Sequence, residues 1–242
     1  MNRLHKDRYI PLKSSALGDN HRSVLMLTAS QGLIYAAAFG AAGKKGRLRP
    51  LIQPFSLCEG ELYFDPVKKL WRLKDGSCID VHDSFHSSLK KYYAATFWCE
   101  LILKTHGGAG SEGFFLLTAN LLDQLDLSKP VAVPSVLIQS LWTFLDLEGI
   151  QPDLTSCARC GRRAPENRTI CYDAGGHVVC SHCRIGTMPL LSAKGRSYLL
   201  GQEKEGISEA SDIDSLFTYL LMILRGLTGS SFEIDGLEII TS

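Results

Sequence analysis

The 242-residue sequence lacks an apolar run long enough to cross a membrane. Its longest strongly apolar stretch, LFTYLLMIL near residue 220, is about half the length of a membrane-spanning helix. The first ten residues, MNRLHKDRYI, are charged, and the apolar segment of a secretory signal does not follow them. Because 45% of the residues are apolar, the chain can still build a substantial core. We therefore expect a globular cytosolic protein.

The sequence also lacks the motifs of common enzyme chemistries. GAAGKKG, residues 40–46, superficially resembles a phosphate-binding loop, but it has neither the required glycine spacing nor a Ser or Thr after the lysine. A GxSxG elbow, an HExxH pair and a plausible carboxylate dyad are all missing. The scattered histidines are interpreted as surface or cap residues: His5, His21, His82, His86 and His106. These absences argue against an enzyme.

The small net charge of +1 hides an asymmetry between two parts of the chain. Residues 1–82 contain 13 Lys and Arg against 7 Asp and Glu, whereas residues 83–242 contain 13 against 18. The first part is therefore +6 and the second −5. An excess of this size on a small domain suggests a polyanionic partner, although such charge can also serve only solubility.

Short β-rich segments separated by turn residues fill the first 82 positions. The segments are DRYIPLK, SVLMLTA, LIYAAAFG, SLCEGELYF and KLWRLKDGSCIDV, and the turn signals are LGDN at 17–20, SQG at 30–32 and KDG at 74–76. About five strands in some 80 residues suit a small barrel of the OB type. This pattern predicts an N-terminal barrel domain over residues 1–82.

After residue 82 the apolar period changes to that of a helix. One face over residues 85–103 predicts a helix of about 22 residues, with Asp83 or Ser84 as N-cap and Gly107 and Gly108 as its end. The residues on this face are Phe85, Leu89, Tyr92, Thr96, Cys99 and Leu103, and further stripes are Leu117, Leu121 and Leu125; Leu137, Leu141 and Phe144; and Leu216, Leu220 and Ile223. The polar segment 201–214 is predicted to be a mobile loop. An α-helical domain over residues 83–242 follows from this pattern.

Five of the eight cysteines lie between residues 157 and 183. Two CxxC turns, Cys157 with Cys160 and Cys180 with Cys183, are separated by 19 residues, a spacing typical of a zinc ribbon. Four thiolates leave no open coordination position, so the metal is expected to be structural. The alternative ligands in the segment, Cys171, His177 and His182, do not share the paired spacing, and Cys58, Cys78 and Cys99 are interpreted as small apolar residues. The helical domain is thus predicted to carry a zinc-binding insertion at residues 155–186.

A second cluster of charge lies in the loop after the third predicted strand. Lys44, Lys45, Arg47 and Arg49 fall within six positions, among glycines that indicate a mobile loop able to meet phosphates. Aromatic residues of the barrel could stack on bases, although each is as readily explained as core: Tyr9, Tyr35, Phe39 and Tyr63. The zinc segment adds Arg159, Arg162, Arg163, Arg168 and Arg184, which suit nucleic acid, an acidic partner or an ordinary solvated surface.

The chain resembles the RecO family of bacterial recombination mediators. The resemblance covers about residues 9–200 and is most specific in GLIYAAAFGAAGKKGRLRPLIQPFSLCEGELYF, in LEGIQPDLTSCARCG and in GGHVVCSHC. It implies an α+β protein of several domains, with an OB-fold followed by a helical domain that carries a zinc knuckle. It also implies that Cys157, Cys160, Cys180 and Cys183 bind zinc and that Lys44, Lys45, Arg47 and Arg49 contact DNA.

The function implied by the resemblance is that of a mediator and not of an enzyme. Such proteins bind single- and double-stranded DNA, anneal strands and work with RecR to help the recombinase displace single-strand binding protein. A cytoplasmic, nucleoid-associated location follows. Two other functions are consistent with the residues alone: a zinc-containing scaffold for protein partners without DNA binding, and a zinc-dependent hydrolase, which would require an open metal position.

Overall fold

A computed structural model describes residues 4–43, 46–107, 112–165, 168–203, 206–207, 209–229 and 236–241. The chain divides into two compact units, one formed by residues 1–88 and 98–127 and the other by residues 89–97 and 128–242. Each unit has its own core and is described separately. The predicted boundary between domains after residue 82 stays a prediction.

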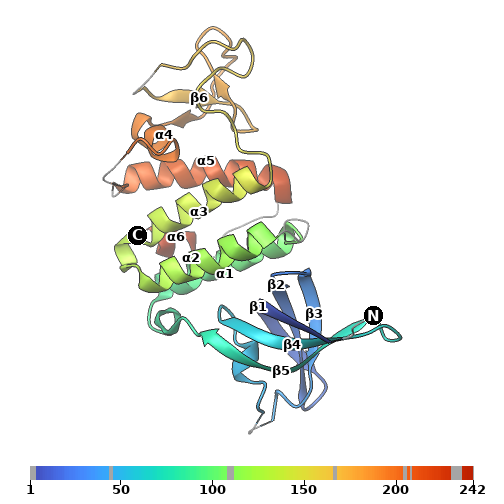
Figure 1. Ribbon diagram of the computed structural model, residues 1–242. Coiled ribbons are helices and arrows are strands. Elements are labelled where there is room, and N and C mark those ends of the chain that lie inside the picture. Colours follow the sequence, from blue (N-terminus) through green and yellow to red (C-terminus); the bar gives the residue numbers. More distant parts are fainter. Residues whose placement is uncertain are drawn as a thin grey trace. The chain divides into compact units, whose positions relative to one another are not determined.

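The first unit contains a closed five-stranded barrel (Figure 1). Its strands are β1 (Leu4–Leu17), β2 (His21–Thr28), β3 (Gly32–Ala38), β4 (Leu57–Asp65) and β5 (Leu70–Asp80). The strand order is β1-β2-β3-β5-β4, and all pairs are antiparallel except β3 with β5. The five predicted segments coincide with these strands, so the expected OB-like barrel is confirmed.

Alternation along the strands fills the barrel interior. The buried interior residues are Tyr9, Val24, Met26, Ile34, Ala36, Ala38, Ala41, Leu48, Leu51, Ile52, Cys58, Leu62 and Leu73. Tyr9, predicted as a possible stacking residue, is fully buried, and its hydroxyl donates to the carbonyl of Leu51 over 3.1 Å. A buried tyrosine requires such a partner, because an unpaired hydroxyl in an apolar core is destabilising.

The sequence suggested that KDG at 74–76 forms a turn between two strands, and this was wrong. These residues lie inside β5, where Glu61 pairs with Asp75 but Leu62 pairs with Leu73. The register shift marks a β-bulge, which uses the same glycine-rich chemistry as a turn and bends the strand without ending it. Gly76 lies opposite Gly60 on β4, so the two backbones approach closely at this point.

The helix predicted to begin at residue 83 is divided in two. A short 3-10 helix, Asp83–His86, precedes α1 (Leu89–Lys104). Ser84 is bonded to Asp126, through both its N–H (3.0 Å) and its hydroxyl (2.6 Å), so it does not cap α1. The predicted apolar face is also partly wrong, since Leu89 and Tyr92 are exposed.

Within the first unit, the C-terminal half of α1 packs with α2 (Glu112–Leu127). The indole N–H of Trp98 donates to the hydroxyl of Thr118 over 3.0 Å in a buried contact. On the barrel side, the Arg8 guanidinium lies 5.5 Å from the centre of the Phe115 ring. These contacts join the helices to the outer face of the barrel.

The second unit is built on α3 (Val133–Leu147) and α5 (Ala210–Thr228), which pack together. The predicted stripes of both helices are buried. The segment Pro130–Leu147, 18 residues with a mean hydropathy of 1.3, is apolar enough by length and composition to cross a membrane. Of this segment, 44% is buried inside the fold, where α3 packs on α5. The predicted mobile loop 201–214 is too long, because α5 already begins at Ala210.

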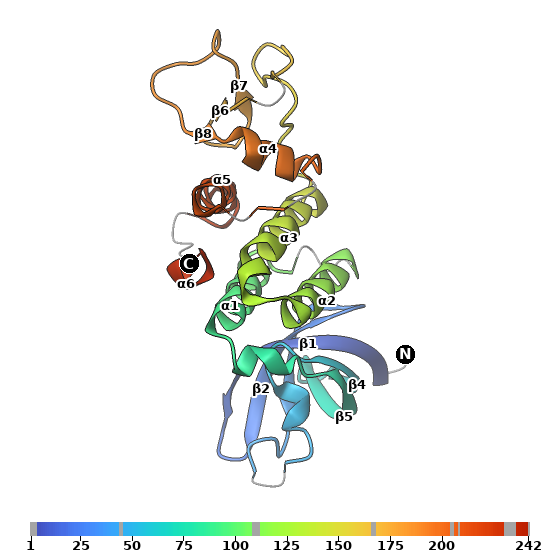
Figure 2. The same cartoon turned by 90° about the vertical axis from the view of Figure 1, so that its left-hand side faces the viewer.

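The cysteine segment is an insertion between α3 and α4 (Ala193–Leu199), as predicted. It forms a small sheet, visible in Figure 2, from β6 (Ile170–Tyr172), β7 (Val178–Val179) and β8 (Leu190–Leu191) in the order β7-β6-β8. The Tyr219 hydroxyl of α5 donates to the carbonyl of Gly176 over 2.8 Å, and the buried Arg196 of α4 donates to the carbonyls of Leu154 and Pro165. The short helix α6 (Leu237–Thr241) completes the described chain.

We expect Gly76→Ala to destabilise the barrel by about 1–3 kcal/mol, because the added methyl would overlap the Glu59 carbonyl and lie 3.0 Å from the Gly60 Cα. Urea-induced unfolding measures the change. Gly226→Ala on α5 is the matched control: its methyl meets no atom within 4 Å, so helix propensity should stabilise this variant by up to about 1 kcal/mol. An unchanged unfolding free energy for Gly76→Ala would contradict the close approach.

Candidate metal centre and nucleic-acid interface

The four cysteines of the two CxxC turns come together in space. The ligand atoms of Cys157, Cys160, Cys180 and Cys183 all lie within 4.8 Å of one another, and the sulfurs of Cys160 and Cys180 are 3.7 Å apart. A tetrahedral ion with metal–sulfur bonds of about 2.3 Å requires sulfurs about 3.8 Å apart. The cluster therefore has the dimensions of a four-thiolate metal site and could hold a metal ion.

Backbone hydrogen bonds shape both cysteine turns. In the first, the N–H of Gly161 donates to the carbonyl of Cys157 over 2.8 Å, and Gly161 has the positive φ of 69° that glycine tolerates. In the second, the N–H of Cys183 donates to the carbonyl of Cys180 over 3.0 Å. The N–H of Ala158 bonds to the carbonyl of Val178 over 2.9 Å, which ties the first turn to β7. Sulfur positions are thus set by the backbone.

The pKa values of the clustered thiols shift in opposite directions. The N–H of Cys180 donates to the Cys157 sulfur over 3.3 Å and lowers the pKa of the Cys157 thiol to about 6. Hydrogen bonds with the thiols of Cys160 and Cys180 raise the pKa of Cys183 to about 12. Four thiolates at this spacing repel one another, and a bound cation removes that repulsion.

The alternative ligands of the segment have other roles. His177 bonds to Asp173, with Nδ1 3.2 Å from Oδ1, and the Nδ1 of His182 lies 2.8 Å from the guanidinium of Arg162. Cys171 belongs to β6 and is not part of the four-cysteine group. The paired spacing of the sequence therefore selects the same four residues as the geometry does.

Two arginines of the insertion connect the two cysteine turns, and other arginines line a hollow beside them. Arg159 donates to the carbonyl of Cys183 over 3.0 Å, and Arg162 contacts His182 of the second turn. A hollow of about 300 Å³ beside the cluster is lined by Arg162, Arg163, Arg168 and Arg184, together with Cys157, Cys180 and neighbouring apolar residues. The hollow is a second cationic surface in addition to the loop of the barrel.

Cys58 and Cys99 are buried, whereas Cys78 is half-buried, and the proximity of Cys58 to Cys78 was missed in the sequence. Burial raises the pKa of Cys58 and of Cys99 to about 12 in each case. Cys58 of β4 and Cys78 of β5 are register partners, and their sulfurs lie 3.3 Å apart. A 20-residue separation gives no sign of this proximity before the strands are paired.

The described part of the basic loop, from Gly46 onward, packs into the barrel, which the sequence did not suggest. Lys44 and Lys45 lie outside the described residues. From Gly46 onward the chain enters a 3-10 helix, Pro50–Ile52, and its apolar residues Leu48, Leu51 and Ile52 belong to the barrel core. The segment therefore closes one end of the barrel as a plug.

The charged side chains of this plug face solvent. Arg47 and Arg49 are both exposed, and they alternate with the buried Leu48. Arg47 lies 3.1 Å from Asp75 of β5, in an ion pair whose arginine side chain is 75% exposed. Such exposed pairs contribute about 0–1 kcal/mol, so a phosphate can compete for Arg47 at little cost.

Two of the four aromatic candidates are available at the barrel surface. Tyr35 of β3 is 64% exposed and Phe39 is 46% exposed, whereas Tyr9 is core. Phe39 lies under the Arg72 guanidinium at 5.5 Å, and Lys74 lies 5.6 Å from the ring centre of Tyr63. Exposed rings beside cations are the surface that stacks bases and holds phosphates in oligonucleotide-binding barrels.

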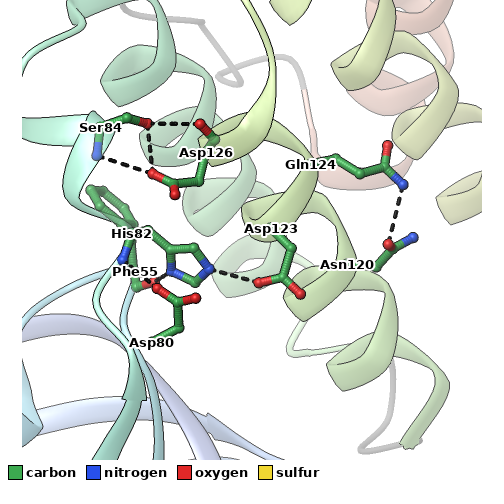
Figure 3. A network of polar contacts seen from close by, with 8 residues as sticks. All are labelled: Phe55, Asp80, His82, Ser84, Asn120, Asp123, Gln124 and Asp126. Carbon is green, nitrogen blue, oxygen red and sulfur yellow. Dashed lines mark hydrogen bonds and ion pairs between the residues drawn. The ribbon is translucent and has the colours of Figure 1, made fainter.

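His82 was expected at the surface or in a cap: it occupies the N-cap position of the 3-10 helix Asp83–His86, without a capping bond from its side chain, and it is not at the surface. It is 1% exposed and lies between Phe55 and Asp123 (Figure 3). Its environment is assembled from residues 27 and 41 positions away, so no local pattern could have shown it.

A closed OB-like barrel followed by helices with a four-cysteine insertion defines a class of protein with a nucleic-acid-binding type of fold. The family description "Recombination protein O N terminal" matches residues 1–82, and "Recombination protein O C terminal" matches residues 86–199. The chain belongs to the RecO family, whose members act in DNA repair and recombination.

Individual relatives agree with the family assignment. The DNA repair protein RecO of Anaeromyxobacter sp. (strain K) is 30% identical over 209 residues, which cover 84% of this chain and 80% of the relative. The DNA repair protein RecO of Thermoanaerobacter sp. (strain X514) is 28% identical over 191 residues, 75% of this chain and 72% of the relative.

We expect Cys157→Ser to lose the bound metal and to unfold at least the segment 157–184, because binding at such a site contributes folding free energy. Plasma mass spectrometry counts each metal per chain, and limited proteolysis reports the order of the segment. Cys171→Ser, in the same small sheet, should keep both metal and protease resistance. A Cys157→Ser protein with stoichiometric metal would show that another ligand completes the site.

Proposed function

We propose that this protein is a non-enzymatic DNA-binding mediator of recombinational repair. It binds single- and double-stranded DNA, anneals strands and, with RecR, helps load the recombinase onto DNA coated by single-strand binding protein. It works in the bacterial cytoplasm at the nucleoid. The observation that carries the proposal is the exposed Arg47 and Arg49 on the plug of a barrel whose residues 1–82 have 13 cationic against 7 anionic side chains.

The plug is suited to holding a phosphate chain. Leu48 and Leu51 are fixed in the core, so Arg47 and Arg49 are held outward without side-chain packing of their own. Lys44 and Lys45 precede them and add two charges. Each neutralised phosphate releases counterions, which gives affinity without sequence preference. Tyr35 and Phe39 add sequence-tolerant stacking for single strands.

Annealing requires that the repulsion between two strands be reduced. The basic plug and the arginine-lined hollow of the cysteine insertion are two separate cationic surfaces of one chain. If each holds phosphates, the protein raises the local concentration of one strand beside the other. This step needs no chemical catalysis.

The metal of the cysteine insertion is proposed to be zinc with a structural role. Four cysteine sulfurs within 4.8 Å of one another suit zinc better than harder ions, and they would fill every position of a tetrahedral site. When bound, zinc supplies charge compensation for the thiolates. The residues Cys157, Cys160, Cys180 and Cys183 hold it, while Arg159 and Arg162 cross-link the two turns.

Replacing Lys44, Lys45, Arg47 and Arg49 together by Gln should reduce the slope of log K against log salt by about 3–4 units on duplex DNA, because up to four phosphate contacts are lost. Fluorescence anisotropy with salt titration measures the slope. The matched control replaces Lys90, Lys104, Lys129 and Lys194 by Gln, which removes the same charge elsewhere. An equal loss in both variants, or no DNA binding by the unaltered protein at low salt, would favour a protein-interaction scaffold.

Asp75→Asn should have the opposite effect. It removes the anionic partner of Arg47 while an amide oxygen remains to accept from the Gly76 N–H. The affinity for single-stranded DNA should rise about two- to five-fold at low salt, as expected for an exposed ion pair. Glu61→Gln, which removes another exposed carboxylate of the barrel, is the control for a general effect of charge on DNA affinity. Unchanged affinity for Asp75→Asn would place Arg47 outside the DNA contact.

A further inference from the structure

A second group of potential metal ligands lies in the first unit, far along the chain from the cysteines. The end of β5, the connection after it and α2 border an open hollow of about 310 Å³. Its lining residues are Leu57, Ile79, Asp80, His82, Asp123, Asp126 and Leu127. Three of these seven side chains are carboxylates, and no Lys or Arg is among the described residues that line the hollow.

The ring of His82 is fixed with both nitrogens facing oxygen acceptors (Figure 3). Nδ1 lies 2.6 Å from the carbonyl of Phe55, and Nε2 lies 2.8 Å from Oδ1 of Asp123. A neutral imidazole has one N–H, so it can donate to only one of them. The carbonyl and an ionised carboxylate are both acceptors, so the neutral ring satisfies only one of them. With the N–H on Nδ1, donating to the carbonyl, the Nε2 lone pair faces the carboxylate, which is the orientation of a metal-binding histidine.

We propose that a divalent first-row metal ion with nitrogen and oxygen preference, such as Mn²⁺, occupies this position. Nε2 of His82 and the carboxylates of Asp80 and Asp123 are its protein ligands, since their ligand atoms all lie within 4.8 Å of one another. Adjacent ligands of an octahedral ion with bonds of about 2.1 Å are about 3 Å apart, close to the 2.8 Å between His82 and Asp123. The remaining positions face the hollow, which has room for water.

The surroundings hold His82 in this orientation before any ion binds. His82 and Phe55 both have left-handed backbone, with φ of 50° and 69°, which is unfavourable for side chains of this size. The His82 ring stacks on Phe85 at 5.6 Å, and the His82 N–H donates to Asp80 over 2.9 Å. A carbonyl bonded to Nδ1 is the common means of orienting a metal-binding histidine.

The bond between Ser84 and Asp126 positions α2, which contributes Asp123 to the site. The Ser84 hydroxyl donates to Oδ1 of Asp126 over 2.6 Å, which ties the connection after β5 to α2. Asp123 lies one turn before Asp126 on α2 and is thereby held against His82. An ion bound by Asp80, His82 and Asp123 would link the last strand of the barrel to α2 within this unit.

Mn²⁺ is the probe, added to full-length protein whose cysteine site is loaded with zinc so that the thiolates do not compete. Electron paramagnetic resonance counts free Mn²⁺ during the titration, and spin-echo modulation detects a coordinated imidazole nitrogen. We expect one Mn²⁺ per chain with nitrogen coupling. Asp80→Asn and Asp123→Asn should each weaken binding at least about ten-fold, since each removes a charged ligand. His82 itself is left unchanged because its buried hydrogen bonds make it a poor test residue.

The control variant Glu61→Gln removes an exposed carboxylate of the same unit and should leave Mn²⁺ affinity unchanged. Thermal melting of each variant without Mn²⁺ verifies that the fold is retained, and with Mn²⁺ the unaltered protein should melt at a higher temperature. The proposal is overturned if Mn²⁺ does not bind stoichiometrically, if Asp80→Asn and Asp123→Asn bind it as the unaltered protein does, or if nitrogen coupling is absent.

Discussion

Closure of the barrel through the parallel contact of β3 with β5 is the constraint on which the first unit depends. The contact is small, with Ala36 opposite Trp71 and Ala37 opposite Arg72. Because β5 lies between β3 and β4 in the sheet, the chain leaving β3 cannot turn directly into β4. It has to cross the end of the barrel, and the apolar side chains of that crossing become core. Arg47 and Arg49 are exposed because they lie on either side of the buried Leu48 in this crossing segment.

The second unit depends on a different kind of constraint. Four sulfurs within 4.8 Å of one another are unfavourable as free thiolates and favourable around a cation. The sheet of β6, β7 and β8 is too small for stability by itself, as its strands are two or three residues long. Attachment to the helices supplies part of the stability that this sheet lacks, and a metal held by the cysteine turns would supply the rest. In the function proposed above, the charge of the first unit serves partner binding and the metal of the second unit serves folding.

Local chemistry explains which predictions from the sequence were correct. The five strands and the four-cysteine cluster follow from alternation and from paired spacing, both of which act over a few residues. The stripes of α3 and α5 follow from one strong helical period. Predictions failed where distant residues decide the structure: Ser84 bonds to Asp126 in place of capping a helix, and KDG forms a bulge because β4 lies beside it. His82 was expected at the surface or in a cap, and its burial could not be predicted for the same reason, since Phe55 and Asp123 are distant in the sequence.

The attachment of the cysteine insertion has a consequence for how its sequence can change. Tyr219 and Arg196 bond to the insertion through the carbonyls of Gly176, Leu154 and Pro165, and the Tyr219 ring also makes an edge contact with Tyr172 of β6. A carbonyl is present whatever residue occupies the position, so substitutions at Leu154 and Pro165 can keep the bonds to Arg196. Gly176 is different, because a Cβ at this position would meet the Ile223 side chain of α5 at 2.6 Å. The anchor at Arg196 should therefore tolerate more sequence change in the insertion than the anchor at Tyr219.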